Sequence, residues 1–133
     1  MPNVLLDTGP LVALFKRNDL HHERAISWFK GQRGTLLTTQ AVVTEAWHLV
    51  SEHVRLPLVR FVTAACVVCE FRPEDMARLV VVLERYADLP MDYADATLIV
   101  MAESQKLDSV ATIDINDFST YRLANGKALK LVF

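Results

Sequence analysis

Short runs of consecutive apolar residues alternate along the chain with longer segments whose apolar residues recur at helical spacing. The short runs predict β-strands, and their continuous apolar character is typical of parallel strands buried on both faces. The region from residue 67 to residue 71 fits either a further strand or the end of a helix. The predicted strands cover residues 3–6, 35–37, 109–113 and 129–133.

The segments between these strands predict helices, and several begin or end at suitable residues. Pro10 and Pro73 suit the first turn of a helix, and Thr39 suits an N-cap position. The dipeptide at 89–90 separates two of the helices. The predicted helices cover residues 10–15, 22–30, 40–52, 73–86 and 92–105, and one more begins at Pro57. This alternation predicts a layered α/β domain.

Length and composition narrow the class of protein. The chain has 133 residues, of which 52% are apolar and 23% charged, which is enough for one core and predicts a single domain over residues 1–133. It contains no repeat, linker or low-complexity segment. No apolar run reaches the roughly 18 residues of a membrane helix, and the first residues do not resemble a signal peptide. Two cysteines do not make a disulfide framework, so we expect a cytoplasmic protein.

Acidic residues stand where an α/β sheet usually carries its chemistry, at strand ends and helix starts. One acid follows the first strand, two follow the strand at 109–113, two lie in the first turn of the helix at 92–105, and one lies within an apolar helical stretch. In chain order these acids are Asp7, Glu45, Asp92, Asp95, Asp114 and Asp117.

Each acid also has an ordinary structural interpretation. Asp7 could cap the helix that follows it, and first-turn acids are favourable against the helix dipole. The acids after the strand at 109–113 could form Asx turns, and Glu45 could pair with a base or face solvent. The joint pattern on one small α/β domain favours convergence.

Converging carboxylates cannot all remain ionised without a cation. Oxygen ligands without histidine or cysteine suit Mg²⁺ or Mn²⁺ rather than Zn²⁺. Such an ion neutralises phosphate charge and activates water for phosphodiester hydrolysis. Thr8 and Thr112 place hydroxyl groups beside the acids, where they could orient a carboxylate or cap a helix. The net charge of −2 gives no general attraction to nucleic acid, although Lys16, Arg17 and Arg24 could contact substrate phosphates or simply be solvated.

Four segments together resemble PIN-domain ribonucleases, most nearly the VapC toxins of toxin–antitoxin pairs. They are VLLDTGPLVALF at 4–15, TEA at 44–46, YADA at 93–96 and TIDINDF at 112–118. By this resemblance Asp7, Glu45, Asp95 and Asp114 are the catalytic and metal-binding quartet. Asp117 matches an accessory metal ligand, and Asp92 has no firm counterpart and stays secondary.

The resemblance also implies properties that the residues alone do not show. It implies a three-layer α/β/α sandwich with a central, mainly parallel sheet of four to five strands. It further implies Mg²⁺- or Mn²⁺-dependent cleavage of single-stranded or looped RNA, a small antitoxin bound over the acidic pocket, and a homodimer without membrane association.

Other functions fit the sequence less well. An aspartyl-phosphate phosphatase usually has a second Asp two residues after the nucleophile, where this chain has Gly9. A response-regulator receiver would need an acidic pair after the first strand and a phosphoacceptor near the middle of the chain. The alternative within the same fold is a catalytically inactive module that binds protein or RNA, although unpaired buried acids are destabilising without a ligand.

Overall fold

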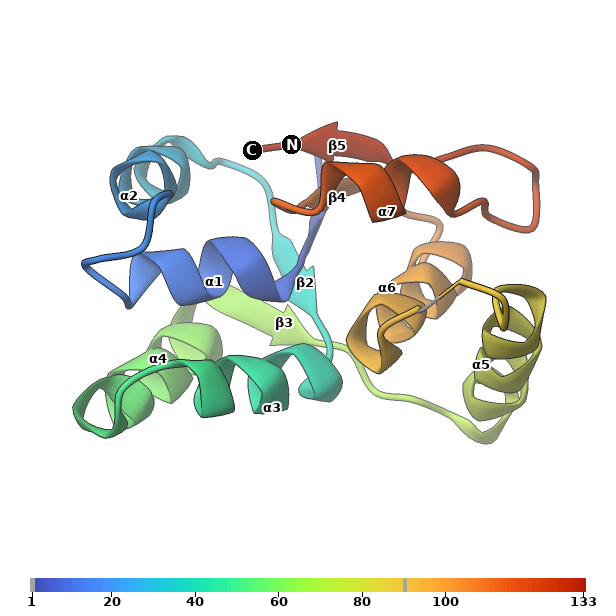
Figure 1. Cartoon of the computed structure of the whole chain (residues 1–133), viewed down its shortest axis with the longest axis horizontal. Coiled ribbons are helices and arrows are strands. Elements are labelled where there is room, and N and C mark those ends of the chain that lie inside the picture. The colour runs from blue at the N-terminus through green and yellow to red at the C-terminus, as the bar shows by residue number, and fades with distance from the viewer. Residues whose placement is uncertain (1, 90) are drawn as a thin grey trace.

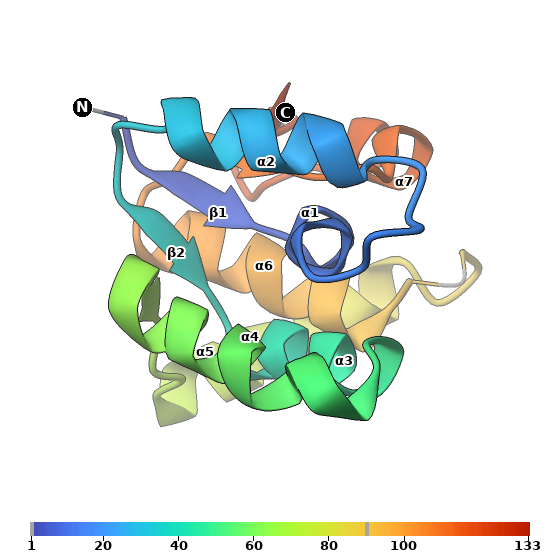
Figure 2. The same cartoon turned by 90° about the vertical axis from the view of Figure 1, so that its left-hand side faces the viewer.

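A sheet of parallel strands forms the centre of the computed structural model, which describes residues 2–89 and 91–133. The strand order is β3-β2-β1-β4-β5, and each neighbouring pair is parallel. Figure 2 shows β1 and β2 side by side and pointing the same way. The strands are β1 (Val4–Leu6), β2 (Leu36–Thr38), β3 (Cys66–Val68), β4 (Ser109–Ala111) and β5 (Lys130–Val132).

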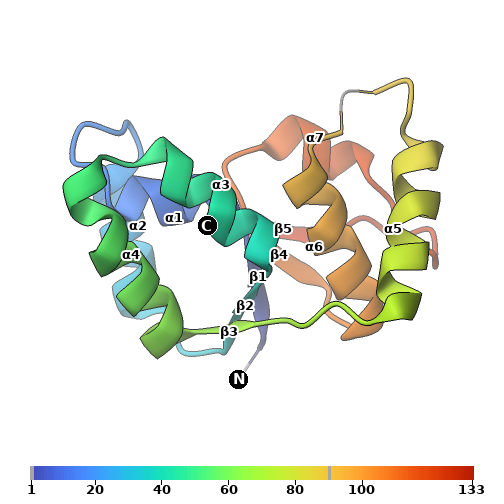
Figure 3. The ribbon, with the colours of Figure 1, turned by 90° about the horizontal axis from the view of Figure 1, so that it is seen from below.

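Helices cover both faces of this sheet (Figures 1 and 3). One face carries α1 (Thr8–Leu14), α2 (His22–Gly31), α3 (Gln40–Leu49) and α4 (Glu52–Ala65). The other face carries α5 (Pro73–Arg85), α6 (Tyr93–Ser104) and α7 (Ile115–Thr120). The architecture is therefore the three-layer α/β/α sandwich that the resemblance implied, with five strands in the sheet.

The core lies around β1, β4 and α6. Leu5, Leu6 and Val110 have no exposed surface, because helices cover both faces of β1 and β4. Every residue from Ala94 to Ala102 on α6 is buried. A helix that is apolar on all sides needs neighbours on several sides, and both α5 and α3 pack against α6.

The sheet order creates a switch point between β1 and β4. From β1 the chain passes to β2 and β3 on one side, and it returns to β4 and β5 on the other. Helix connections therefore leave β1 and β4 in opposite directions, which opens a crevice at their carboxyl ends. Leu6 pairs with Ala111, so Asp7 and Thr112 follow the two strands at the same level.

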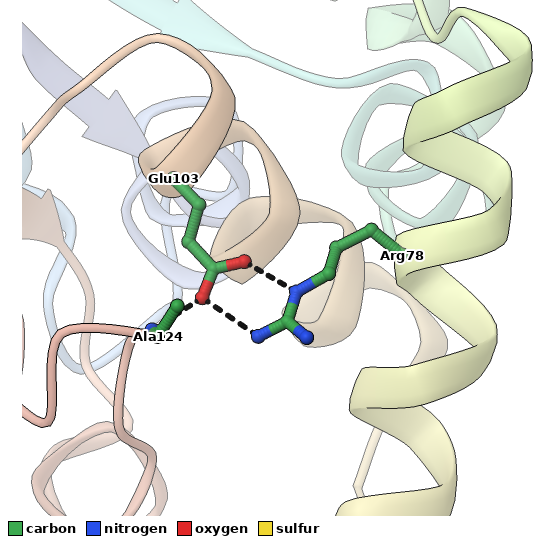
Figure 4. Close-up of polar contacts among 3 residues, drawn as sticks. All are labelled: Arg78, Glu103 and Ala124. Carbon is green, nitrogen blue, oxygen red and sulfur yellow. Dashed lines mark hydrogen bonds and ion pairs between the residues drawn. The ribbon is translucent and has the colours of Figure 1, made fainter.

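A paired charge fixes α5 against α6 and the loop that precedes β5 (Figure 4). Both Nε and Nη2 of Arg78 donate hydrogen bonds to Glu103, at 2.8 and 3.1 Å. The backbone amide of Ala124 donates a third hydrogen bond to the same carboxylate at 2.6 Å. Glu103 thus joins three segments at the end of α6 that lies away from Asp95.

Several predicted boundaries were wrong. Pro57 lies inside α4 rather than in its first turn, since that helix begins after Ser51. The exposed position of Pro57 leaves the unpaired helix carbonyl near solvent, which makes the proline tolerable. The preceding helix ends at Leu49 instead of 52, and β4 ends at Ala111 instead of 113. Pro90, which was expected to separate two helices, lies outside the described residues.

Two other segments differ from the sequence interpretation. The strand expected within residues 67–71 is β3, which follows α4 directly. The short helix α7 was not predicted, because its acids were interpreted as turn residues. Within residues 2–89 and 91–133, no helix has both the length and the apolar character required to cross a membrane.

Candidate metal centre

An open cleft of about 650 Å³ lies at the carboxyl ends of β1 and β4. All the acids singled out from the sequence line it, from four different segments of the chain. Asp19, which no sequence pattern indicated, lines it as well. The acids of the cleft are Asp7, Asp19, Glu45, Asp92, Asp95, Asp114 and Asp117, and Lys16 is the one basic residue among the described lining residues.

Asp7 is buried at the start of α1, and its carboxylate is hydrogen-bonded to a residue that follows the neighbouring strand β4. It occupies the N-cap position, yet its side chain makes no capping hydrogen bond. Instead the hydroxyl of Thr112 donates to Oδ2 of Asp7 at 2.7 Å. Burial raises the pKa of Asp7 to about 6, and the hydrogen bond from Thr112 opposes this rise. The carboxylate is therefore available for a ligand rather than for capping.

The two threonines of the cleft behave differently. Oγ1 of Thr112 also accepts a hydrogen bond from the amide of Asp114 at 2.9 Å, so one hydroxyl connects two acids. Oγ1 of Thr8 is buried without a hydrogen-bond partner in the part of the chain that the structure describes. The Thr8 side chain nevertheless lowers the pKa of Glu45, so this hydroxyl lies close to a carboxylate of the cleft.

Gly9 allows α1 to start close to the segment that follows β4. A Cβ atom at this position would lie 3.0 Å from Cδ1 of Ile113, which is closer than ordinary packing permits. The absence of a side chain therefore lets the start of α1 approach the segment that carries Asp114.

Asp95 is the most perturbed carboxyl group of the cleft. It lies in the first turn of α6 and is only 6% exposed. Burial, with a further contribution from the nearby Asp7, raises the pKa of Asp95 to about 8. The hydroxyl of Tyr121 donates to Oδ2 of Asp95 at 3.1 Å and orients it. Burial and the neighbouring Asp95 raise the pKa of Tyr121 as well, which keeps its proton in place.

Asp92 and Asp114 combine a structural contact with a place in the cleft. Asp92 is the N-cap of α6, where it accepts from the amide of Ala94 at 2.7 Å. Asp114 is the N-cap of α7, where it accepts from the amide of Asp117 at 3.3 Å. The contact with the Asp114 carboxylate raises the pKa of Asp117. Capping was expected for Asp7, but it is Asp92 and Asp114 that cap helices, and both still line the cleft.

Three of the acids come close enough to hold one ion. Carboxylate oxygens of Asp95, Asp114 and Asp117 all lie within 4.8 Å of one another. This donor set contains oxygen alone and fits a hard cation such as Mg²⁺ or Mn²⁺. Asp7 lies beside the group, and its negative charge contributes to the raised pKa of Asp95. A divalent cation would relieve the repulsion that these shifts reflect.

Glu45 lies on α3, on the wall of the cleft and outside this group of three. It is half-buried, and burial and the carboxylate of Asp92 raise its pKa. Thr39 caps α3 and lies 2.8 Å from Thr97 on α6, oxygen to oxygen. This buried contact fixes the helix of Glu45 against the helix of Asp95. Thr97 was not singled out in the sequence, since only the tertiary contact reveals it.

Comparison with known protein families shows the family of this chain. The family model described as PIN domain matches residues 4–123. The chain belongs to the PIN domain family. The family predicted from four short motifs is therefore confirmed.

Solved structures share the fold of this PIN domain. The VapC20 toxin of Mycobacterium tuberculosis, described as cleaving the sarcin-ricin loop, has a TM-score of 0.77 at 16% identity, over 85% of this chain and 91% of that one. VapBC2 from Rickettsia felis, bound to a DNA fragment from its promoter, has a TM-score of 0.66 at 12% identity, over 98% and 97%. A search of curated protein sequences gives no significant match.

Proposed function

We propose that this PIN domain is an endoribonuclease that uses Mg²⁺ or Mn²⁺ to hydrolyse phosphodiester bonds of single-stranded or looped RNA. The observation that carries the proposal is the group of three carboxylates within 4.8 Å of one another, in a cleft at the switch point of the sheet. A site of this composition has few other uses, because unpaired acids at this density destabilise a fold without a cation.

We assign a role to each acid of the cleft from its position. Asp95, Asp114 and Asp117 hold the metal, and we place Asp7 and Glu45 with them on the strength of the family motifs. Asp92 caps α6 and is secondary. When bound, the ion supplies charge neutralisation at the phosphate and a more acidic water.

The hydrogen bonds around the acids prepare this arrangement. Tyr121 holds Asp95, and Thr112 holds Asp7 and the backbone of Asp114. Because these partners are themselves buried or part of the core, the carboxylates keep their direction before substrate arrives. Such preorganisation is what lets a site stabilise developing charge efficiently.

We further propose that the protein is the toxin of a VapBC-type pair and acts in the cytoplasm. The structural likeness to VapC20, named as a toxin, and to the VapBC2 complex supports this proposal. A small antitoxin that covers the acidic cleft and a homodimer are the partners that the family resemblance predicts. Co-expression with the protein encoded by a short upstream reading frame would test the pairing. That protein should relieve toxicity and co-purify with this chain.

Cleavage of an RNA pool tests the enzymatic proposal. The purified chain is incubated with RNA and Mn²⁺, Mg²⁺ or EDTA, beside the variants Asp7→Asn and Asp88→Asn. Asp88 is an exposed acid outside the cleft, so its variant makes the same chemical change elsewhere. Cleavage should need the metal, disappear in Asp7→Asn and persist in Asp88→Asn. Equal rates in all three proteins would refute the site, and no cleavage with any metal would favour an inactive binding module.

A further inference from the structure

A second cavity adjoins the acidic cleft and carries charge of the opposite sign. It has a volume of about 590 Å³ and lies between the end of α1 and the start of α4. Its polar lining includes Lys16, Arg17, His22 and His53, and no carboxylate is among its described lining residues. Lys16 lines both cavities, so the two are adjacent. We call this second cavity the basic pocket.

The cations of the basic pocket are not used by the fold. Lys16 and Arg17 are exposed, and within the described ranges no carboxylate lies within 4.0 Å of either. Arg24 is different, since its guanidinium stacks over the ring of Phe133 and donates to the carbonyl of that residue. Of the three basic residues that the sequence singled out, Lys16 and Arg17 therefore remain available for a ligand.

The rest of the basic pocket is preorganised and partly apolar. Nδ1 of His22 lies 2.7 Å from the carbonyl oxygen of Ala13, which fixes the ring. Phe15 and Val54 are half-buried and form an apolar part of the wall. A cavity of this size, with cations at the rim and an apolar surface inside, matches a nucleotide that has a phosphate outside and a base or ribose within.

We propose that the basic pocket binds the RNA strand next to the bond that is cut, with Lys16 and Arg17 on its phosphates. This inference rests on the proposed nuclease function. A cleft with seven acids and a chain of net charge −2 repel a polyanion, so the strand needs cations close to the cleft to stay in register. Lys16 stands at the junction, where the strand would pass from the basic pocket to the acids.

Binding of a labelled single-stranded RNA in EDTA tests this assignment without any cleavage. Fluorescence anisotropy compares the wild-type chain with Lys16→Ala/Arg17→Ala and with Arg60→Ala. Arg60 is exposed on α4 and lines neither cavity, so its variant shows the effect of losing one positive charge elsewhere, against two in the double variant. The double variant should bind about tenfold more weakly, and its slope of log K against log salt should be shallower by about 1.4 for two lost phosphate contacts.

The outcomes separate the two proposals. The double variant binding as tightly as Arg60→Ala, or no RNA binding by the wild-type chain, would overturn the basic pocket while leaving metal-dependent cleavage intact. Binding that depends on Lys16 and Arg17 in a protein that cleaves no RNA would instead contradict the nuclease. Lys16, Arg17 and Arg60 are all exposed, so the thermal unfolding temperature of each variant should equal that of the wild type. An unchanged unfolding temperature shows that the variant is folded.

Discussion

The hydroxyl of Thr112 donates a hydrogen bond to the carboxylate of Asp7, with 2.7 Å between the oxygens, although the residues are 105 positions apart. The same oxygen accepts from the amide of Asp114. A single buried side chain thus sets the direction of one acid and the backbone of another. Neighbouring parallel strands make this possible, because β1 and β4 end at the same level.

Replacing Thr112 by Val should disturb both acids at once. The lost hydrogen bond no longer lowers the pKa of Asp7, so metal binding and cleavage should shift to higher pH. The free energy of unfolding should fall by about 1 kcal/mol, the usual net value of such a bond. A pH profile of Mn²⁺ affinity measures the shift. Thr112→Ser keeps the hydroxyl and should restore the profile; a profile that Val leaves unchanged would contradict the role of Thr112.

The raised pKa values of Asp7 and Asp95 predict how stability depends on pH without metal. Both start from 3.8 and reach about 6 and about 8 in the folded protein. Between pH about 4 and pH about 8 the folded state binds more protons than the unfolded state. The free energy of unfolding should therefore decrease as pH rises through this interval. Denaturation by urea in EDTA at several pH values measures this decrease.

The variant Asp95→Asn isolates the main contribution. It should flatten the decrease and make the metal-free protein more stable near neutral pH, on the order of a few kcal/mol at most. Asp88→Asn should follow the wild-type curve. Parallel curves for wild type and Asp95→Asn would show that Asp95 is not held in the protonated form.

Tyr121→Phe removes the hydrogen bond to Asp95 while it keeps the ring that packs against Phe118. We expect Mn²⁺ affinity to drop about tenfold, as is typical when the partner of a metal ligand is lost. Tyr86→Phe is the matched control, because that hydroxyl accepts a hydrogen bond from the amide of Arg122 and touches no acid of the cleft. Calorimetry that finds equal affinity in the two variants would argue that Tyr121 has only a structural role.

The acids were predictable from the sequence because their places follow from local rules. Strand ends and helix starts can be located from apolar runs, and parallel strands bring their carboxyl ends to one edge. This reasoning anticipated the cleft and the positions of Asp7, Asp95 and Asp114 in it. It could not tell which acids lie close enough together to share one ion. The structure groups Asp117 with Asp95 and Asp114, and Glu45 lies outside this group.

The supporting residues left no local signal. Tyr121 meets Asp95 across 26 positions, and Thr39 meets Thr97 across 58. Neither pair has a pattern of its own, since each depends on how α6 packs within the core. The position of Pro57 inside α4 was missed for a related reason. An exposed proline is tolerated where tertiary packing of the opposite face, through Leu58 and Val62, holds the helix together.

Titration of Mn²⁺ into the metal-free chain at neutral pH tests the central claim most directly. We expect saturable binding with release of protons, because ions displace the proton held on Asp95, whose pKa is about 8. Asp95→Asn should abolish this binding, and Asp88→Asn should retain it. Heat or spectral changes that are absent in the wild type, or identical in both variants, would contradict the assignment of the acidic cleft as a metal centre.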